Sequence, residues 1–563
     1  TLVNKFTTIA DNKPIVYVHD AGNVVIDNFT VDGAGKGNSN YRFEGIAFYN
    51  AGGTVRNCEI LDIRETPLSG SQHGVALYAY NADGTARTLN VTSNTMSGYQ
   101  KNGMALNGTG LTVYVSANTT TGKGDSPEIA QNGIQVGWSA TGQIVSNITS
   151  GHVYTGTSDP YPDDGYTCSG AGTKGDVDHY KKCWTAAGIL VYDASATVFG
   201  NTVYENQVGV SVASSATANY NNVYDNVIFG VAADSGSSVH AENNWWGSST
   251  GPTHSGNPGG QGDAVYGDVD YDPWLGYPVG LWVEVPGGTF IPGDTVSVVV
   301  KMGTPGSILG GQFTLAYDST RLTLNSVTPG PRFPTKWVDT TVTNQVTAAF
   351  ENLGLPFSGT DALAFLNFTV QAGAVGDNDL DLTAGLFSLT GDSNPFVVSC
   401  LGDGTLTVSA PGSVSGKVIL QGRDYDGHPG NRNGGATIVL SVAGGTTTSA
   451  TPGGEFSFSA VRPGGYEAQA SMPGYLTAVK PSITVASGPN PIGTVKLLGG
   501  DATRDQMINI QDLAYIGSRF NKATPWDPND SWADINADNN IDILDLTLAG
   551  SNFGKAAPQG WTT

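Results

Sequence analysis

Two acidic segments near the end of the chain carry oxygen-bearing side chains at the spacing of a calcium-binding loop. Calcium prefers six to eight oxygen ligands, and a twelve-residue loop supplies them from positions 1, 3, 5, 7, 9 and 12, with a backbone carbonyl at position 7. These positions are Asp501, Thr503, Asp505, Met507, Asn509 and Asp512 in the first segment, and Asp534, Asn536, Asp538, Asn540, Asp542 and Asp545 in the second. The sequence therefore predicts that these residues bind two calcium ions.

The two segments are copies of one unit. Asp534 follows Asp501 by 33 residues, and the stretch 517–523 recurs at the same offset as 550–556. Each loop runs into an expected helix that starts with Asp-Leu, at 512–513 and 545–546. A duplicated calcium loop followed by such helices resembles a dockerin, and the resemblance covers residues 499–556. It implies folding that depends on calcium and a partner that carries a cohesin domain.

The resemblance also implies which side chains touch the partner. They are Ile510, Gln511, Ser518 and Lys522 in the first half, and Ile543, Leu544, Ser551 and Lys555 in the second. The alternative interpretation is that Ile510 and Ile543 belong to the hydrophobic core. The first loop departs from the family pattern at Thr503, and position 6, usually glycine, is Gln506 or Asn539. Because Asn tolerates a left-handed backbone better than Gln, we expect the first site to be weaker and more strained.

Acidic side chains in the first half of the chain are candidates for general acid or base catalysis. They are Asp62 with Arg64, Asp125 with Glu128, and Asp163 and Asp164 with His179. None of these groups repeats a lyase or hydrolase signature. We interpret them as solvated turn residues and assign no catalytic residue.

The length and composition of the chain indicate the fold class of the domains that carry these residues. The chain has 563 residues, too many for one core, and 77 of them are glycine, whereas charged residues make up only 13%. Many turns and few charges favour a mainly β, multi-domain protein. Asp and Glu number 49 against 26 Lys and Arg, a formal charge of −23, which argues against a nucleic-acid partner.

Residues 1–280 repeat with a period of roughly 20 to 30 residues, which is typical of a stacked solenoid. Strand starts of the form Gly-apolar recur at Gly45, Gly74, Gly103, Gly133, Gly188, Gly209 and Gly230. Asn201, Asn222 and Asn243 keep a step of 21 in the last coils, where Asn can bond to the Asn of the next coil. The pattern resembles a right-handed parallel β-helix of the pectate-lyase-like superfamily. Segments 242–252 and 268–275 resemble the closure of such helices.

The repeat breaks between Gly151 and Ala187, where we expect a long polar loop. Cys168 and Cys183 flank part of this loop, and we predict a disulfide between them outside the cytosol. Cys58 and Cys400 lie in apolar strand patterns and are expected to be buried thiols. No apolar run is long enough to span a membrane. The chain opens at Thr1 without a signal-peptide pattern, which indicates a mature or trimmed form.

Strand-like alternation at sandwich spacing replaces the repeat from Leu281 onward. The ordered segments 292–296, 313–322 and 364–370 resemble a cohesin, the receptor that binds dockerins, over residues 281–410; an immunoglobulin-like spacer is the alternative. Residues 411–498 resemble a carboxypeptidase-regulatory-like β-sandwich, which we interpret as a spacer. The predicted fold is thus a β-helix, two β-sandwiches and a small α-helical calcium-binding dockerin at 499–563.

Two functions remain open. In the first, the chain is a structural subunit, extracellular or at the surface of a prokaryotic cell, that self-associates head to tail through cohesin–dockerin pairing into a calcium-dependent filament. In the second, it is a polysaccharide lyase or glycoside hydrolase, or a glycan-binding adhesin, docked to the cohesin of a separate scaffold. The cohesin-like segment favours the first, because docked enzymes of this kind usually carry only the dockerin. The partner is then the cohesin-like domain of another copy, and a polysaccharide ligand remains an alternative.

Overall fold

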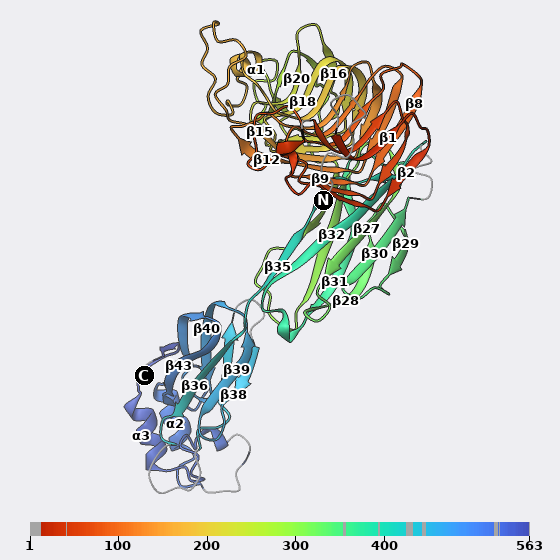
Figure 1. The fold of residues 1–563 in the computed structure, drawn as a ribbon. Helices are drawn as coiled ribbons and strands as arrows, with labels where there is room; N and C mark the ends of the chain where they lie inside the picture. The colour runs from red at the N-terminus through yellow and green to blue at the C-terminus, as the bar shows by residue number, and fades with distance from the viewer. Residues whose placement is uncertain are drawn as a thin grey trace.

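The computed structural model describes residues 13–40, 42–352, 356–391, 395–423, 432–441, 446–522, 527 and 530–561. The protein is mainly β and multi-domain, as the sequence predicts. Three cores follow one another along the molecule, from the β-helix to the C-terminal module (Figure 1). None of the helices in this described part has the length and hydropathy that crossing a bilayer requires. The first residues, including Thr1, lie outside the described residues.

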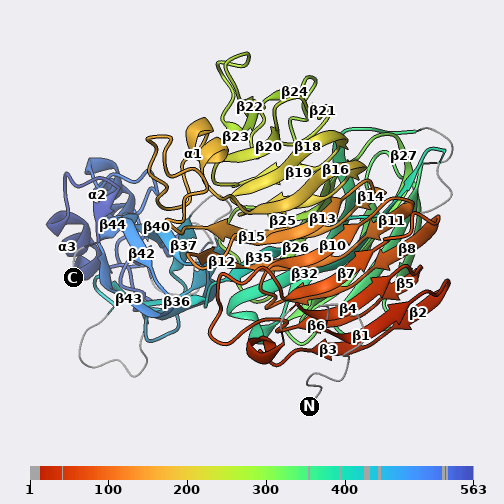
Figure 2. The same ribbon diagram turned by 45° about the horizontal axis from the view of Figure 1, so that its top comes forward.

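Three stacks of parallel strands form the β-helix (Figure 2). The first stack contains β1 (Lys13–His19), β4 (Phe43–Tyr49), β7 (Val75–Tyr80), β10 (Asn102–Asn107), β13 (Asn132–Gly137), β16 (Ala187–Phe199), β18 (Val208–Asn219), β20 (Phe229–Ala233) and β23 (Gly262–Tyr266). The second contains β2 (Val24–Asp27), β5 (Gly53–Arg56), β8 (Arg87–Thr92), β11 (Leu111–Ser116) and β14 (Thr141–Val145), then the far halves of β16 and β18, β21 (Ser238–His240) and β24 (Asp268–Asp270). The third contains β3 (Thr30–Asp32), β6 (Glu59–Leu61), β9 (Thr95–Ser97), β12 (Thr119–Ser126), β15 (Ile148–Tyr154), β17 (Thr202–Tyr204) and β19 (Asn222–Tyr224). A 3-10 turn, η1 (Gly37–Ser39), and a short strand, β22 (Pro252–Thr253), complete this part.

A ladder of buried asparagines runs through the turn between the second and third stacks. The backbone N–H and side-chain Nδ2 of each asparagine donate to Oδ1 of the next, at 2.7–3.0 Å. The ladder contains Asn94, Asn118, Asn147, Asn201, Asn221 and Asn244. The repeat analysis therefore chose two neighbours in error. Asn222 bonds instead to the backbone of Val279, and Asn243 adopts a left-handed turn (φ 60°).

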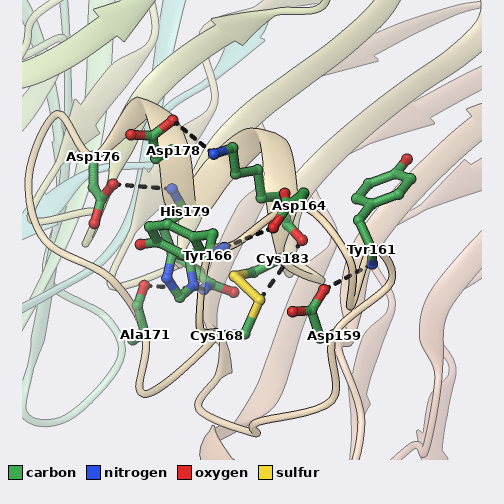
Figure 3. Close-up of a disulfide and its surroundings, with 12 residues drawn as sticks. Asp159, Tyr161, Asp164, Tyr166, Cys168, Ala171, Asp176, Asp178, His179 and Cys183 are labelled. Atoms are coloured by element: carbon green, nitrogen blue, oxygen red, sulfur yellow. Dashed lines mark hydrogen bonds and ion pairs between the residues drawn. A yellow bond between two sulfur atoms is a disulfide. The ribbon is translucent and has the colours of Figure 1, made fainter.

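The expected loop leaves the β-helix after β15 and returns at β16, and a disulfide closes part of it (Figure 3). Cys168 and Cys183 are joined, with their Cα atoms 5.6 Å apart. The bond brackets α1 (Val177–Lys182), whose N-terminus is capped by Asp176 accepting from the N–H of His179 at 2.9 Å. Cys58 is a buried thiol, as expected, but Cys400, which lies near Tyr224 of the β-helix at the junction of two domains, is only partly buried.

The second core belongs to a sandwich of two sheets, antiparallel except for the pair of β25 and β34. One sheet orders β28 (Leu322–Pro329), β31 (Thr360–Val370), β26 (Thr295–Gly303), β25 (Gly280–Glu284) and β34 (Leu401–Gly402). The strand order in the other sheet is β29 (Thr335–Asp339), β30 (Gln345–Glu351), β27 (Ile308–Tyr317), β32 (Gly376–Leu389) and β33 (Phe396–Val397). Strand β35 (Gly404–Val408) also pairs with β32, and the 3-10 turn η2 (Ala372–Ala374) precedes β32 in the chain. The sandwich rests on the flank of the β-helix, where the hydroxyls of Thr202 and Ser399 bond at 2.9 Å and the rings of Phe199 and Phe396 pack at 5.8 Å.

The third core spans two segments that the sequence divides at residue 498. The sandwich strands are β39 (Glu455–Val461), β36 (Gly412–Leu420) and β43 (Gly488–Leu497) in one sheet, and β38 (Thr446–Ser449), β37 (Thr437–Ser441), β40 (Gly464–Ser471), β42 (Ala478–Val485) and β45 (Gln559–Gly560) in the other. The C-terminal module adds α2 (Ile510–Gly517), η3 (Asp530–Trp532) and α3 (Ile543–Ser551), and β41 (Gly474–Tyr475) pairs with β44 (Gly499–Asp501). Ile508, Ile535 and Ile541 of the module are buried in the same core as Val495 of the sandwich. The two segments therefore form one packed unit.

Removing one member of the asparagine ladder should destabilise the β-helix. Asn147→Ala leaves the buried N–H of Asn118 without its acceptor, which costs about 2 kcal/mol, whereas Nδ2 of Asn118 keeps the carbonyls of Val91 and Ser116. We expect a clear fall in the temperature of the β-helix transition in scanning calorimetry of the full chain. Asn90→Ala, on the outer side of β8, is the control and should change that temperature little. Equal effects of the two substitutions would contradict the role of the ladder.

Candidate calcium and docking sites

The first carboxylate of each predicted calcium loop faces into the loop and holds its turn. Asp501 accepts the backbone N–H groups of Asp505 and Gln506 at 3.0 and 3.1 Å. Asp534 accepts those of Asp538 and Asn539 at 3.1 and 3.0 Å. Both aspartates are buried. The two loops thus repeat the same bonds at the 33-residue offset of the sequence.

The last carboxylate of each loop lies in the first turn of the following helix. Asp512 completes a capping box on α2 with Asn509, and Asp545 completes one on α3 with Asp542. One oxygen of each carboxylate also reaches back to the loop. Oδ1 of Asp512 accepts from the N–H of Thr503 at 2.9 Å, and Oδ1 of Asp545 accepts from that of Asn536 at 3.2 Å. Loop and helix are therefore held as one unit.

The donor set fits a hard divalent cation. Carboxylate oxygens of Asp501, Asp505 and Asp512 all lie within 4.8 Å of one another. Burial raises the pKa of Asp501, Asp534 and Asp545 to about 6, and neighbouring carboxylates add to the shift. Buried carboxylates that repel one another are the environment in which calcium supplies the missing charge. The residues named by the sequence would hold the ion, with the carbonyls of Met507 and Asn540 as further oxygens.

The two halves of the module close on each other through equivalent backbone bonds. Ile508 donates to Lys555 at 2.9 Å, and its counterpart Ile541 donates to Lys522 at 3.1 Å. In the reverse direction Gly554 donates to Ile508 and Asn521 donates to Ile541, both at 2.8 Å. The residues of each bond in one half are 33 positions from their counterparts in the other half. The duplication in sequence is therefore an approximate two-fold symmetry in space.

The unusual residue at position 6 of the first loop has a structural explanation. Gln506 and Asn539 both take the left-handed backbone that glycine favours, with φ of 67° and 73°. Gln506 in addition reaches the neighbouring sandwich: Oε1 accepts from the N–H of Thr477 at 3.0 Å, and Nε2 donates to the carbonyl of Tyr475 at 3.3 Å. Nε2 also donates to Asp501 at 3.1 Å. The side chain thus ties the first loop to the spacer, a function that glycine cannot supply.

The predicted partner-contact residues all lie at the surface, either in the two helices or just after them. The exposed fractions of Ile510, Ile543 and Leu544 are 66%, 62% and 46%, so the interpretation of the two isoleucines as core residues is wrong. Gln511, Ser518, Lys522, Ser551 and Lys555 are exposed as well. Two exposed apolar side chains that sequence reasoning missed, Phe520 and Phe553, follow the same 33-residue offset. We call the exposed contact residues of each half a patch, the first around Ile510 and the second around Ile543.

Sequence reasoning also missed the polar anchors between module and spacer. Buried Tyr475 donates its hydroxyl to the carbonyl of Ile535 at 2.7 Å and accepts from Arg423 at 3.0 Å. Within the module, Asp530 pairs with Arg519 at 2.8 Å and with Lys522 at 2.9 Å. No regular spacing marks these residues, and Tyr475 acts on segments more than 50 residues away in the chain.

The candidate catalytic groups do not converge on one site. Asp62 pairs with Arg64 at 3.0 Å, and Glu128 accepts from the hydroxyl of Ser126 at 2.9 Å. In the loop, Asp163 and Asp164 are exposed, whereas His179 is buried beside Gln207. These contacts are those of turn and loop residues.

The sandwich offers one face suited to a receptor. Strands β30, β27 and β32 lie side by side and line a hollow of about 320 Å³ that includes Leu309, Gln312 and Leu386. The edge strand β29 of the same sheet carries Trp337, which is 56% exposed. An exposed tryptophan beside an apolar hollow is typical of a protein-binding surface.

Comparison with known families assigns two of these regions. The model for a right-handed β-helix region matches residues 44–246, and the model for a cohesin domain matches residues 283–408. The chain therefore contains both, as the sequence predicts. Neither match extends into the spacer or the C-terminal module, and no curated protein matches the chain.

Solved structures similar to this chain include cohesins. A type II cohesin–X–dockerin complex from Acetivibrio cellulolyticus is 23% identical, with 26% of this chain and 96% of that chain covered at a TM-score of 0.23. A cohesin from Clostridium acetobutylicum is 21% identical, with 23% and 92% covered at 0.20. The cohesin module of a Clostridium perfringens family 33 glycoside hydrolase is 14% identical, with 23% and 96% covered at 0.20.

Glycine at position 6 should have opposite effects in the two loops. Gln506→Gly relieves a left-handed backbone but removes three hydrogen bonds, so we expect a net loss of about 1–2 kcal/mol in the free energy of unfolding. Asn539→Gly only relieves the backbone and should leave stability unchanged or slightly higher, by up to about 0.5 kcal/mol. Urea unfolding of the two calcium-saturated variants measures the difference. A stabilising effect at both positions would show that the tie to the spacer contributes nothing.

Proposed function

We propose that this protein is an extracellular structural subunit that assembles head to tail, its C-terminal dockerin-like module binding the cohesin domain of another copy in the presence of calcium. The observation that carries the proposal is that one chain contains a cohesin domain and a C-terminal module with two acidic loops in a 33-residue duplication and exposed apolar side chains in both halves. Receptor and ligand on one chain are the minimum needed for a homopolymer.

The short connection between the two binding surfaces supports association between chains over closure within one chain. Only five residues separate the core residues Val408 and Val414. Arg462 of the spacer pairs with Asp294 of the cohesin domain and donates to the carbonyl of Thr289 at 2.9 Å. The module in turn shares the core of the spacer. It therefore extends away from the cohesin domain (Figure 1) and is held there.

The symmetry of the module supports two alternative docking orientations. The patch around Ile510 and the patch around Ile543 are related by the same operation that relates the two calcium loops. A receptor that accepts one patch can accept the other after a rotation of about 180°. Different surfaces meeting head to tail form a ring where the rotation closes and a filament where it does not.

Calcium should bind to two sites and stabilise the C-terminal unit. Because the buried carboxylates repel one another without a cation, we expect calcium to raise the temperature of that unit's unfolding transition in the full chain. Titration calorimetry should find two sites. Asp538→Ala removes a charge and should weaken one of them roughly ten-fold or more, about 1.4 kcal/mol. Thr503→Ala, which removes a neutral ligand, should cost less. An absence of calcium binding to the intact chain would contradict the proposed module.

Assembly should require calcium and at least one intact patch. Sedimentation velocity of the full chain is expected to show large species in calcium and monomers in chelator. Ile510→Asp or Ile543→Asp alone should leave assembly possible through the other patch, whereas the double variant should remain monomeric. Val375→Asp is the control, because Val375 is an exposed apolar residue of the cohesin domain and lies outside both patches. Monomers at high concentration in calcium would overturn self-assembly and favour docking to a separate scaffold.

A further inference from the structure

A groove of about 780 Å³ lies where the disulfide-closed loop meets the outer face of the β-helix. The loop contributes Tyr161, Lys181 and Trp184 to its walls. The β-helix contributes Asp234, which follows β20, together with Tyr266 and Asp268 at the end of the last coil. Neither the docking function nor the repeat architecture accounts for this groove.

Two large aromatic side chains line the groove and are exposed to solvent. Trp184 is 54% exposed and Tyr161 is 58% exposed. Trp184 directly follows Cys183, so the disulfide holds its backbone (Figure 3). The backbone N–H of Tyr161 donates to Asp159 at 2.7 Å in a local turn. An exposed aromatic ring beside a cross-link, such as that of Trp184, loses little conformational entropy when a ligand covers it.

The helix of the loop is anchored to the β-helix beneath. The ring of Tyr180 packs against Phe229 at 5.6 Å and Tyr266 at 5.5 Å. Its hydroxyl donates to Oδ1 of Asp234 at 2.7 Å and bonds to the hydroxyl of Ser211 at 3.1 Å. The wall and floor of the groove are therefore connected, and the groove is formed before any ligand arrives.

The polar groups of the groove select the chemistry of its ligand. Asp234, Asp268, Ser235 and Ser237 offer carboxylate and hydroxyl oxygens. The ammonium of Lys181 lies over the ring of Tyr266 at 5.2 Å. Two carboxylates against one cation, in a chain of charge −23, disfavour a polyanion such as a uronate polymer or a nucleic acid. Carboxylates and hydroxyls are good partners for the hydroxyls of a neutral ligand.

We propose that this groove binds a neutral oligosaccharide. A pyranose ring has an apolar face of C–H groups, which stacks on an aromatic ring, and an edge of hydroxyls, which bonds to carboxylates and serines. The groove presents both kinds of group in one open channel. The C–H face lies on Trp184 or Tyr161, and the hydroxyl edge faces Asp234 and Asp268. This binding is independent of cohesin-mediated assembly, because the cohesin domain and the C-terminal module contribute no residue to the groove.

Affinity electrophoresis of the full chain tests the proposal. The gels contain hydroxyethyl cellulose, xyloglucan, arabinoxylan or galactomannan as neutral probes, and polygalacturonate or alginate as charged ones, all in chelator so that assembly does not contribute. We expect retardation by at least one neutral probe and none by the charged probes. Trp184→Ala should weaken the apparent affinity ten-fold or more, and Tyr161→Ala should weaken it several-fold.

Trp138→Ala is the matched control, because that tryptophan is 52% exposed and lies on the β-helix outside the lining of the groove. It should retain full retardation. Asp268→Asn tests the hydroxyl-binding edge without removing bulk and should weaken binding as well. An unchanged melting temperature separates each effect from misfolding. The proposal is overturned by an absence of retardation with every neutral probe, by stronger retardation with the uronates, or by a Trp184→Ala variant that binds like the parent.

Discussion

The pairing of buried polar atoms in the coil turns is the constraint on which the rest of the molecule depends. A parallel β-helix brings the same turn back at every coil, and each turn buries backbone N–H groups that strand pairing does not satisfy. The asparagine ladder supplies an acceptor to each of them in register, from Asn94 to Asn244. Asn222 directly follows the ladder residue Asn221. It bonds to the backbone of Val279 across the junction and so connects the solenoid to the cohesin domain.

Each later junction along the chain is held by contacts of a different kind. Hydroxyl pairing and aromatic packing join the β-helix to the cohesin domain at Thr202, Ser399 and Phe199. An ion pair at Arg462 joins the cohesin domain to the spacer, and a shared core with Tyr475 at its centre joins the spacer to the C-terminal module. A molecule whose binding surfaces keep a constant geometry transmits one rotation per subunit, which is the condition for an ordered assembly.

Much of the candidate site could be predicted because calcium loops are local. Every predicted ligand lies within twelve residues of its partners, so spacing alone indicated which oxygens meet. The exposure of Ile510 and Ile543 could not be decided in this way, since an amphipathic pattern does not reveal which face the neighbouring domain covers. The same limit applies to Gln506, whose departure from glycine is explained only by Thr477 and Tyr475 of another segment.

The sequence by itself determined the class of fold, the β-helix and cohesin regions and the 33-residue duplication, because repeats and ligand spacing are short-range patterns that survive in one dimension. Only the tertiary structure decided which of two adjacent asparagines faces inward, that Cys400 lies half-buried at a junction, and that the last two predicted domains share a core. It also brought Tyr161 and Trp184 beside Asp234 and Asp268. These outcomes depend on contacts between residues far apart in the chain, where burial is set by the partner surface and not by the residue's own neighbours.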